Sequence, residues 1–356
     1  MKSLRFPGRF CVGSDMLKHT ADLVSGYGKK ILFIGGRRAL EASRSELEEG
    51  FAQSSCLCGF VTCGKIATVS EIERIMRLDT VKGADVLCAV GGGACMDITR
   101  TAANRLGKSL VMIPTTAASD APCSFVSVFY AEDGQKVVGD QIFHKCPDMV
   151  LVDSGIIAQA PARHLAAGIA DALATFYEAH ACKQTTMGTE ITNTAMMMAL
   201  LCRDLILRDG LAAYQSAVQN IVTPQLENVI EANCFLSGAG GANTGCAAAH
   251  GIGDYLCRLP EGHAFMHGER VFVGLIVQLI LEQYPEEEIH KVLRFGRNLE
   301  LPLCIRDLGV KNTKECADEL AEGLQEDHFM ANLSCDHSRP VLAGAFLYAQ
   351  YLADNL

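Results

Sequence analysis

Three residues that lie far apart in the chain, Asp171, His250 and His267, have side chains that can bind a divalent metal. Asp171 lies in the apolar run AGIADALAT (167–175), where a carboxylate is costly to bury unless it is paired or bound to metal. His250 ends a run of small residues and His267 precedes a glycine, so ligands could approach both closely. Imidazole and carboxylate ligands suit zinc and also iron. The pattern does not show that the three residues meet, and an isolated histidine is more often structural.

A glycine run, AVGGGACMDITR (89–100), follows an apolar stretch upstream. A buried strand, then Gly92 and Gly93, then a helix with Asp97 in its first turn is how a parallel sheet builds a phosphate cradle. Glycines let the backbone approach a pyrophosphate, and the free amides at the helix start face it. The standard GxGxxG fingerprint is absent. A tight turn made for packing therefore remains the alternative.

The loop PTTAASDAPCS (114–124) leaves the end of another apolar run, 109–113. In open α/β sheets, ligands bind at this end of the strands. The loop offers one carboxylate, Asp120, and several hydroxyls, those of Thr115, Thr116, Ser119 and Ser124. A cluster of turn and cap residues is the alternative interpretation.

These residues must be positioned by the elements around them, and the first part of the chain alternates strand and helix patterns. Short apolar runs predict strands at 10–13, 31–34, 59–63, 85–90, 109–113, 125–130, 136–138 and 149–152. Because helical patterns such as 37–51 separate the earlier strands, we expect a parallel sheet covered on both faces.

After Pro161 the strand patterns almost vanish. Helices are expected at 162–182, 190–208, 211–220, 225–237, 242–257, 268–282, 286–296, 313–324 and 340–353. The sequence therefore predicts an α/β dinucleotide-binding domain at 1–157 and an all-α metal-binding domain at 158–356.

Composition narrows the class of protein. The 356 residues carry a net charge of −10 and no basic block, which argues against binding nucleic acid or an anionic membrane. The longest mostly apolar runs are too short to span a bilayer, which needs ~20 residues. The N-terminus lacks the apolar core of a signal peptide. Sixteen cysteines without any CxxC pair indicate reduced thiols in a cytoplasmic protein.

Several motifs in order resemble the iron-containing alcohol dehydrogenase superfamily, and within it the glycerol dehydrogenases. The similar stretches are GGGACMD, PTTAASDAPCSFVSVFY, VLVDSGIIAQAPARHLAAGIADALATFYEA, AAAHGI and the HGE at 267–269. The two histidine motifs are also separated as in that family, by 267 − 250 = 17 residues. The resemblance covers essentially the whole chain and implies a fold related to dehydroquinate synthase.

The resemblance implies a metal-dependent enzyme that moves a hydride between glycerol, or a similar vicinal diol, and a nicotinamide cofactor. Zn²⁺, or alternatively Fe²⁺, would be bound by Asp171, His250 and His267, and Asp120 would touch a substrate hydroxyl. The resemblance implies that NAD or NADP is bound by Gly92, Gly93, Thr115, Ser119, Ser124, Val126 and Tyr130. Gly36, Arg37 and Asp97 are further candidate cofactor residues, taken from this sequence itself. Members of the family associate, so a homo-oligomer is expected.

Two positions depart from the family pattern. Members specific for NAD carry an Asp at the end of the second strand, where this chain has Gly36 followed by Arg37 and Arg38. Glycine leaves room for a 2′-phosphate and arginine can pair with it, so NADP(H) is expected to be accepted. The alternative is that the two arginines only begin a solvated helix. Arg100 stands where the family usually has Lys, and the two cations differ in geometry.

Other activities on related scaffolds remain open from the sequence. The nearest is an NADPH-dependent reductase of 2-oxo acids (a hydroxycarboxylate dehydrogenase), against which Asp120 argues, because a carboxylate would repel an acid substrate. A carbon–oxygen lyase of the dehydroquinate synthase type would need several basic groups for a sugar phosphate, and no such cluster lies near Asp171 or His250 in the sequence. A non-catalytic binding paralogue is disfavoured because all three candidate metal ligands are present.

Overall fold

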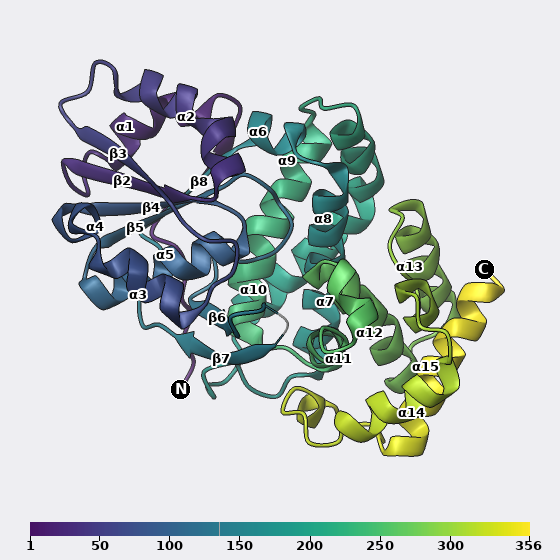
Figure 1. Ribbon diagram of the computed structural model, residues 1–356. Coiled ribbons are helices and arrows are strands. Elements are labelled where there is room, and N and C mark those ends of the chain that lie inside the picture. Colours follow the sequence, from purple (N-terminus) through teal and green to yellow (C-terminus); the bar gives the residue numbers. More distant parts are fainter. Residues whose placement is uncertain (135) are drawn as a thin grey trace.

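The computed structural model describes residues 1–134 and 136–356, and Figure 1 shows a sheet beside a group of helices. Six strands form one parallel sheet in the order β1-β8-β5-β4-β2-β3. They are β1 (Phe10–Gly13), β2 (Lys30–Gly35), β3 (Leu57–Thr62), β4 (Val86–Gly91), β5 (Ser109–Pro114) and β8 (Met149–Asp153). All six agree with the predicted runs to within two residues at each end. The parallel sheet is thus confirmed.

Alternate residues of the buried strands pack onto opposite faces of the sheet, because side chains along a strand alternate in direction. Ile31 and Phe33 share an apolar cluster with residues of α2 (Arg37–Phe51), whereas Leu32 and Ile34 face the opposite side. Figure 1 shows α1 and α2 over one face and α3 and α5 over the other. The helices of this part, besides α2, are α1 (Thr20–Val24), α3 (Val69–Arg77), α4 (Asp79–Gly83) and α5 (Gly93–Leu106).

The strand order creates one place where the chain reverses its direction across the sheet. From β2 the chain moves outward to β3 and then returns to β4 on the other side of β2. Because loops leave β2 and β4 in opposite directions there, a crevice opens at their carboxyl ends, and ligands bind at such switch points. A separate antiparallel hairpin, β6 (Val126–Tyr130) and β7 (Val137–Ile142), follows β5.

Helices make up the rest of the fold, and among the described residues no strand follows β8. They are α6 (Ser154–Gln159), α7 (Ala162–Ala181), α8 (Asn193–Val218), α9 (Pro224–Glu231), α10 (Ser237–Thr244), α11 (Ala248–Leu256), α12 (His267–Leu281), α13 (Glu286–Asn298), α14 (Thr313–Gly323) and α15 (Arg339–Asp354). A π-helical turn at Ala232–Leu236 joins α9 to α10. Within the described residues, no helix combines the length and apolarity needed to cross a bilayer.

Two helix predictions were wrong. The segments 190–208 and 211–220 form one continuous helix, α8, because Gly210 sits against the ring of Phe295 instead of ending the helix. The predicted helix at 242–257 is instead two helices, α10 and α11. It breaks at Gly245, whose φ of +115° is a conformation that side chains rarely adopt. This break starts a new helix just before His250.

Candidate metal centre and cofactor cleft

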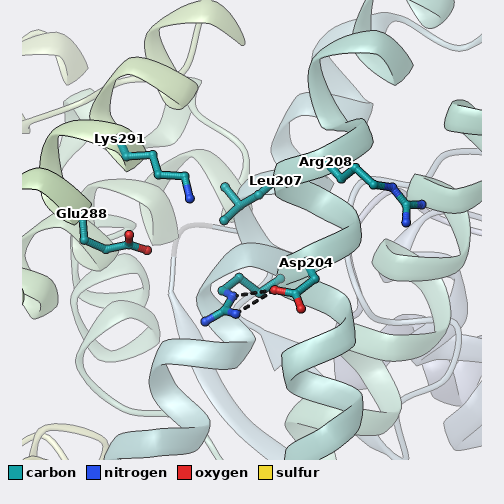
Figure 2. Close-up of a pocket in the computed structure, with 6 residues that line it drawn as sticks. Asp204, Leu207, Arg208, Glu288 and Lys291 are labelled. Atoms are coloured by element: carbon teal, nitrogen blue, oxygen red, sulfur yellow. Dashed lines mark hydrogen bonds and ion pairs between the residues drawn. The ribbon is translucent and has the colours of Figure 1, made fainter.

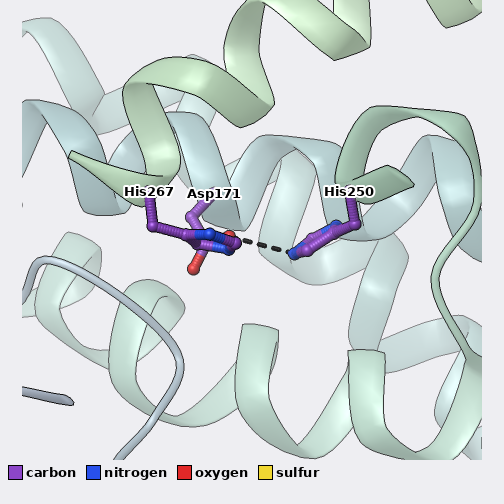
Figure 3. A group of neighbouring side chains, drawn as sticks. All are labelled: Asp171, His250 and His267. Carbon is purple, nitrogen blue, oxygen red and sulfur yellow. Dashed lines mark ion pairs between the residues drawn. The ribbon is translucent and has the colours of Figure 1, made fainter. Parts of the chain in front are cut away.

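Asp171, His250 and His267 converge although they come from three helices (Figure 3). Nε2 of His250 lies 3.3 Å from Asp171 Oδ1, and Nε2 of His267 lies 3.5 Å from the same oxygen. Asp171 lies in the middle of α7, His250 in the first turn of α11, and His267 is the first residue of α12. One ligand atom from each side chain lies within 4.8 Å of the other two. The structure therefore brings together the three residues that the sequence singled out.

Glycines at the helix crossings allow this convergence. A Cβ on Gly268, next to His267, would lie 1.9 Å from the carbonyl oxygen of Ala167 on α7. A Cβ on Gly253 of α11 would lie 2.9 Å from the Val271 side chain of α12. Only glycine fits at contacts this close, so α12 begins against α7 and runs beside α11.

The Asp171 carboxylate is buried, with 2% of its surface exposed. Its Oδ2 accepts a hydrogen bond from the backbone amide of Asp120 at 3.3 Å, but its Oδ1 accepts none from the described residues. Burial acts to raise the pKa of Asp171, and the two nearby imidazoles outweigh it and hold that pKa well below its usual range. A buried anionic oxygen without a hydrogen bond, facing two ring nitrogens, fits a divalent cation with N and O ligands.

Asp120 lies in the loop after β5, next to the three candidate ligands through its amide contact with Asp171. Burial, and then the negative charge of Asp171, raise the pKa of Asp120 to about 6. The residue expected to touch substrate thus borders the candidate metal centre. A carboxyl group there can accept or donate a hydrogen bond to a small polar ligand near neutral pH.

The glycine turn after β4 and the loop after β5 lie against each other. Gly91 has a φ of +152°, which favours glycine, and no side chain caps the start of α5. A Cβ on Gly93 would lie 3.9 Å from Ser119 Oγ, while the Thr115 amide donates to the Gly91 carbonyl at 3.2 Å. The amides at the start of this 14-residue helix have no side-chain cap and lie in a glycine turn at the carboxyl end of β4, an arrangement that fits a phosphate group.

Arg100 is fully buried and holds several predicted cofactor residues in place. It donates to Asp97 Oδ1 and to the Val126 carbonyl, both at 2.6 Å, and also to the Ala121 carbonyl. Asp97 is therefore engaged by Arg100, and burial raises the pKa of Asp97 to about 6. The guanidinium has several donors at fixed angles, which explains how Arg at this position ties α5 to β6 and to the 114–124 loop.

The remaining predicted cofactor residues lie on β6, just before it, or directly after β2. Ser124 Oγ accepts from the Val126 amide at 3.0 Å, and burial raises the pKa of Tyr130 to about 12. A Cβ on Gly36 would meet nothing within 4 Å, and Arg37 directly follows it. Arg37 and Arg38 are exposed, and neither side chain forms an ion pair or hydrogen bond with the described residues.

Comparisons with known proteins identify the family to which the chain belongs. A family model described as iron-containing alcohol dehydrogenase matches residues 7–154. A glycerol dehydrogenase from Escherichia coli O6:H1 is 36% identical over 314 residues, which make up 86% of this chain and 85% of the relative. The chain belongs to the iron-containing alcohol dehydrogenase family. A glycerol dehydrogenase from Thermotoga maritima is 33% identical over 94% of this chain and 90% of its own. The crystal structure of a probable glycerol dehydrogenase from Sinorhizobium meliloti 1021 superposes with a TM-score of 0.92 at 32% identity, over all of both chains.

As an iron-containing alcohol dehydrogenase, the chain is an oxidoreductase, and its helical half carries all three candidate metal ligands. Sequence reasoning missed two carboxylates in that half. Glu178 Oε2 lies 2.5 Å from His250 Nδ1, and Asp254 Oδ1 lies 3.6 Å from His267 Nδ1. Glu178 follows Asp171 by seven residues, a spacing that places both on one side of a helix. That spacing was visible in the sequence.

Proposed function

We propose that this protein is a metal-dependent dehydrogenase that transfers a hydride between glycerol, or a similar vicinal diol, and a nicotinamide cofactor. The observation that carries the proposal is the buried Asp171 Oδ1, which faces two imidazoles without a hydrogen bond beside the Asp120 loop. The diol as substrate class is supported by the glycerol dehydrogenases to which the chain is similar.

In this proposal each residue has a defined task. Asp171 Oδ1 and the Nε2 atoms of His250 and His267 hold a divalent ion, with Zn²⁺ preferred over Fe²⁺ because such sites generally bind zinc more tightly. When bound, the ion supplies a Lewis acid that lowers the pKa of a substrate hydroxyl. Asp120 binds the second hydroxyl of a vicinal diol and so orients the carbon that is oxidised. The amides at the start of α5 bind the phosphates of the dinucleotide.

We further propose that NADP(H) is accepted. The open space at Gly36 leaves room for a 2′-phosphate, and the exposed guanidinium groups of Arg37 and Arg38, which have no ion-pair partner among the described residues, can bind it. The end of β2 lies next to the end of β4, so this group would adjoin the glycine turn that binds the pyrophosphate.

We also propose the domain boundaries, the cellular location and the association of the protein. The α/β domain is assigned to 1–157 and the helical domain to 158–356. All sixteen cysteines are free thiols, which supports a cytoplasmic location. Association into a homo-oligomer is proposed from family membership alone.

A spectrophotometric screen with both cofactors tests the function. Glycerol and 1,2-propanediol should each reduce the cofactor in the metal-loaded enzyme, whereas 2-oxobutyrate should not oxidise its reduced form. Two carboxylates, Asp120 and Asp171, border the site and disfavour an acid substrate. Turnover of 2-oxobutyrate with inert diols would establish the 2-oxo acid reductase instead, and a reaction without net change in the cofactor would indicate the lyase.

A further inference from the structure

Glu178 is the most buried acidic side chain next to the candidate metal centre, with 1% of its surface exposed. It lies on α7, about two helical turns after Asp171. Its Oε1 accepts hydrogen bonds from the backbone amides of Ala247 at 2.8 Å and His250 at 2.9 Å. Its Oε2 lies 2.5 Å from His250 Nδ1. Both oxygens are therefore used, and both act on the helix start that carries His250.

The start of α11 depends on other helices because its own sequence supplies no cap. The residue before the helix, Ala247, has no side chain that can accept from the first-turn amides. Glu178 from α7 satisfies two of these amides, and Gln278 from α12 accepts from the Ala249 amide at 2.9 Å. His250 is thus held through its backbone as well as through its ring.

The contact with Nδ1 determines which ring nitrogen of His250 is free. When Nδ1–H donates to Glu178, the lone pair is on Nε2, which faces Asp171 Oδ1 at 3.3 Å. Cys246 also lies near this carboxylate and imidazole. The 2.5 Å contact leaves no space for an ion between Glu178 and His250, so the group around Cys246 is a hydrogen-bonded support and not a second metal site.

The other imidazole has a weaker support. His267 Nδ1 lies 3.6 Å from Asp254, whose side chain is 43% exposed. A contact of this length at the surface orients a ring less firmly than a short buried hydrogen bond. Of the two histidines, only His250 therefore has a buried charged partner at Nδ1 among the described residues.

We propose that Glu178 is a positioning residue that fixes the tautomer and ring plane of His250, so that Nε2 is presented as a metal ligand. This inference rests on the proposed metal centre. Glutamine at this position has nearly the same shape but only one acceptor oxygen. That oxygen can accept from either the two backbone amides or the imidazole. The NH₂ group of the glutamine then faces whichever of these donors the oxygen does not reach. Carboxylates that orient a metal-bound histidine in this way change metal affinity by ~10- to 100-fold when they are replaced.

The test compares wild type with Glu178→Gln and a control, Glu282→Gln. Glu282 accepts a hydrogen bond from Gln278 at 3.0 Å and has no contact with either imidazole, so its replacement changes a neighbouring carboxylate only. Metal-free proteins are titrated with Zn²⁺ against a chelator of known affinity. They are also titrated with Co²⁺, whose visible absorption reports the ligand geometry. Thermal unfolding of the metal-free forms measures any structural damage separately.

We expect Glu178→Gln to weaken Zn²⁺ binding ~10- to 100-fold and to alter the Co²⁺ spectrum, while Glu282→Gln stays within about twofold of wild type. Wild-type affinity and spectrum in Glu178→Gln would overturn the inference and leave the metal centre standing. Equal weakening in both variants, with equally lowered unfolding temperatures, would overturn it in favour of a structural role. Failure of wild type to bind either ion would overturn the metal centre and this inference with it.

Discussion

Replacing Gly36 with Asp tests the basis of cofactor choice with one charge. The new side chain fits without displacing a neighbour, because a Cβ on Gly36 meets nothing within 4 Å. Two unit charges ~5 Å apart in water repel by ~0.8 kcal/mol, so a doubly charged 2′-phosphate is disfavoured by ~1.6 kcal/mol. A hydrogen bond from the ribose of NAD to the new carboxylate favours NAD by a further ~1 kcal/mol. The preference should therefore shift towards NAD by a factor on the order of 100.

The measurement is kcat/KM for the oxidised forms of both cofactors, followed by the absorbance of the reduced nicotinamide. Gly344→Asp is the matched control, since Gly344 also has open space around a Cβ but lies on α15. Replacing Arg37 or Arg38 with Ala should lower kcat/KM for NADP more than for NAD. An unchanged ratio in Gly36→Asp, or an equal change in Gly344→Asp, would refute the assignment of this position to the 2′-phosphate.

Three further outcomes follow from the same structure. Removing the metal with a chelator should abolish activity and lower the unfolding temperature, since an ion at 100 times its Kd stabilises the folded protein by about 2.7 kcal/mol. Adding Zn²⁺ should restore both. Activity that is unaffected by full metal removal would count against the metal centre. Gly168→Ala should lower stability by ~1–3 kcal/mol, because its Cβ would lie 1.8 Å from the Ala117 carbonyl, whereas Gly344→Ala in open space should not destabilise. Burial raises the pKa of Asp97 from 3.8 to about 6. The free energy of unfolding of wild type should therefore rise relative to that of Asp97→Asn as pH falls through about 6, and this gain should be lost as pH rises again. A difference in unfolding free energy that stays constant from about pH 8 to about pH 5 would contradict this.

The sheet was predictable because its strands are short apolar runs buried on both faces. The helix boundaries were less so, and the two errors have one cause. Gly210 and Gly245 look alike in the sequence, yet the first continues a helix and the second ends one. Packing against Phe295 decides the first case, and a φ of +115° decides the second. Such contacts are made by residues distant in the chain, so local patterns do not contain them.

Only part of the candidate site could be predicted from the sequence. The types of Asp171, His250 and His267 indicated metal ligands, but their meeting depends on how three helices cross, and only the family resemblance suggested it beforehand. Glu178 was overlooked, although its spacing from Asp171 places both on one side of α7. A buried carboxylate needs a partner, and a second carboxylate on the same face of a buried helix is therefore a usable sign of a supported metal ligand.

The first turns of α7 set the distance between the substrate loop and the metal centre. Gly168 allows the Ala117 carbonyl of the 114–124 loop to touch α7, and Gly268 allows α12 to touch the adjacent Ala167. The loop that carries Asp120 and the helix that begins with His267 are therefore docked on neighbouring residues of one helix. Asp171 follows these contacts by about one turn. Because backbone contacts fix this geometry, side chains can change the substrate or cofactor preference while the metal centre keeps its shape.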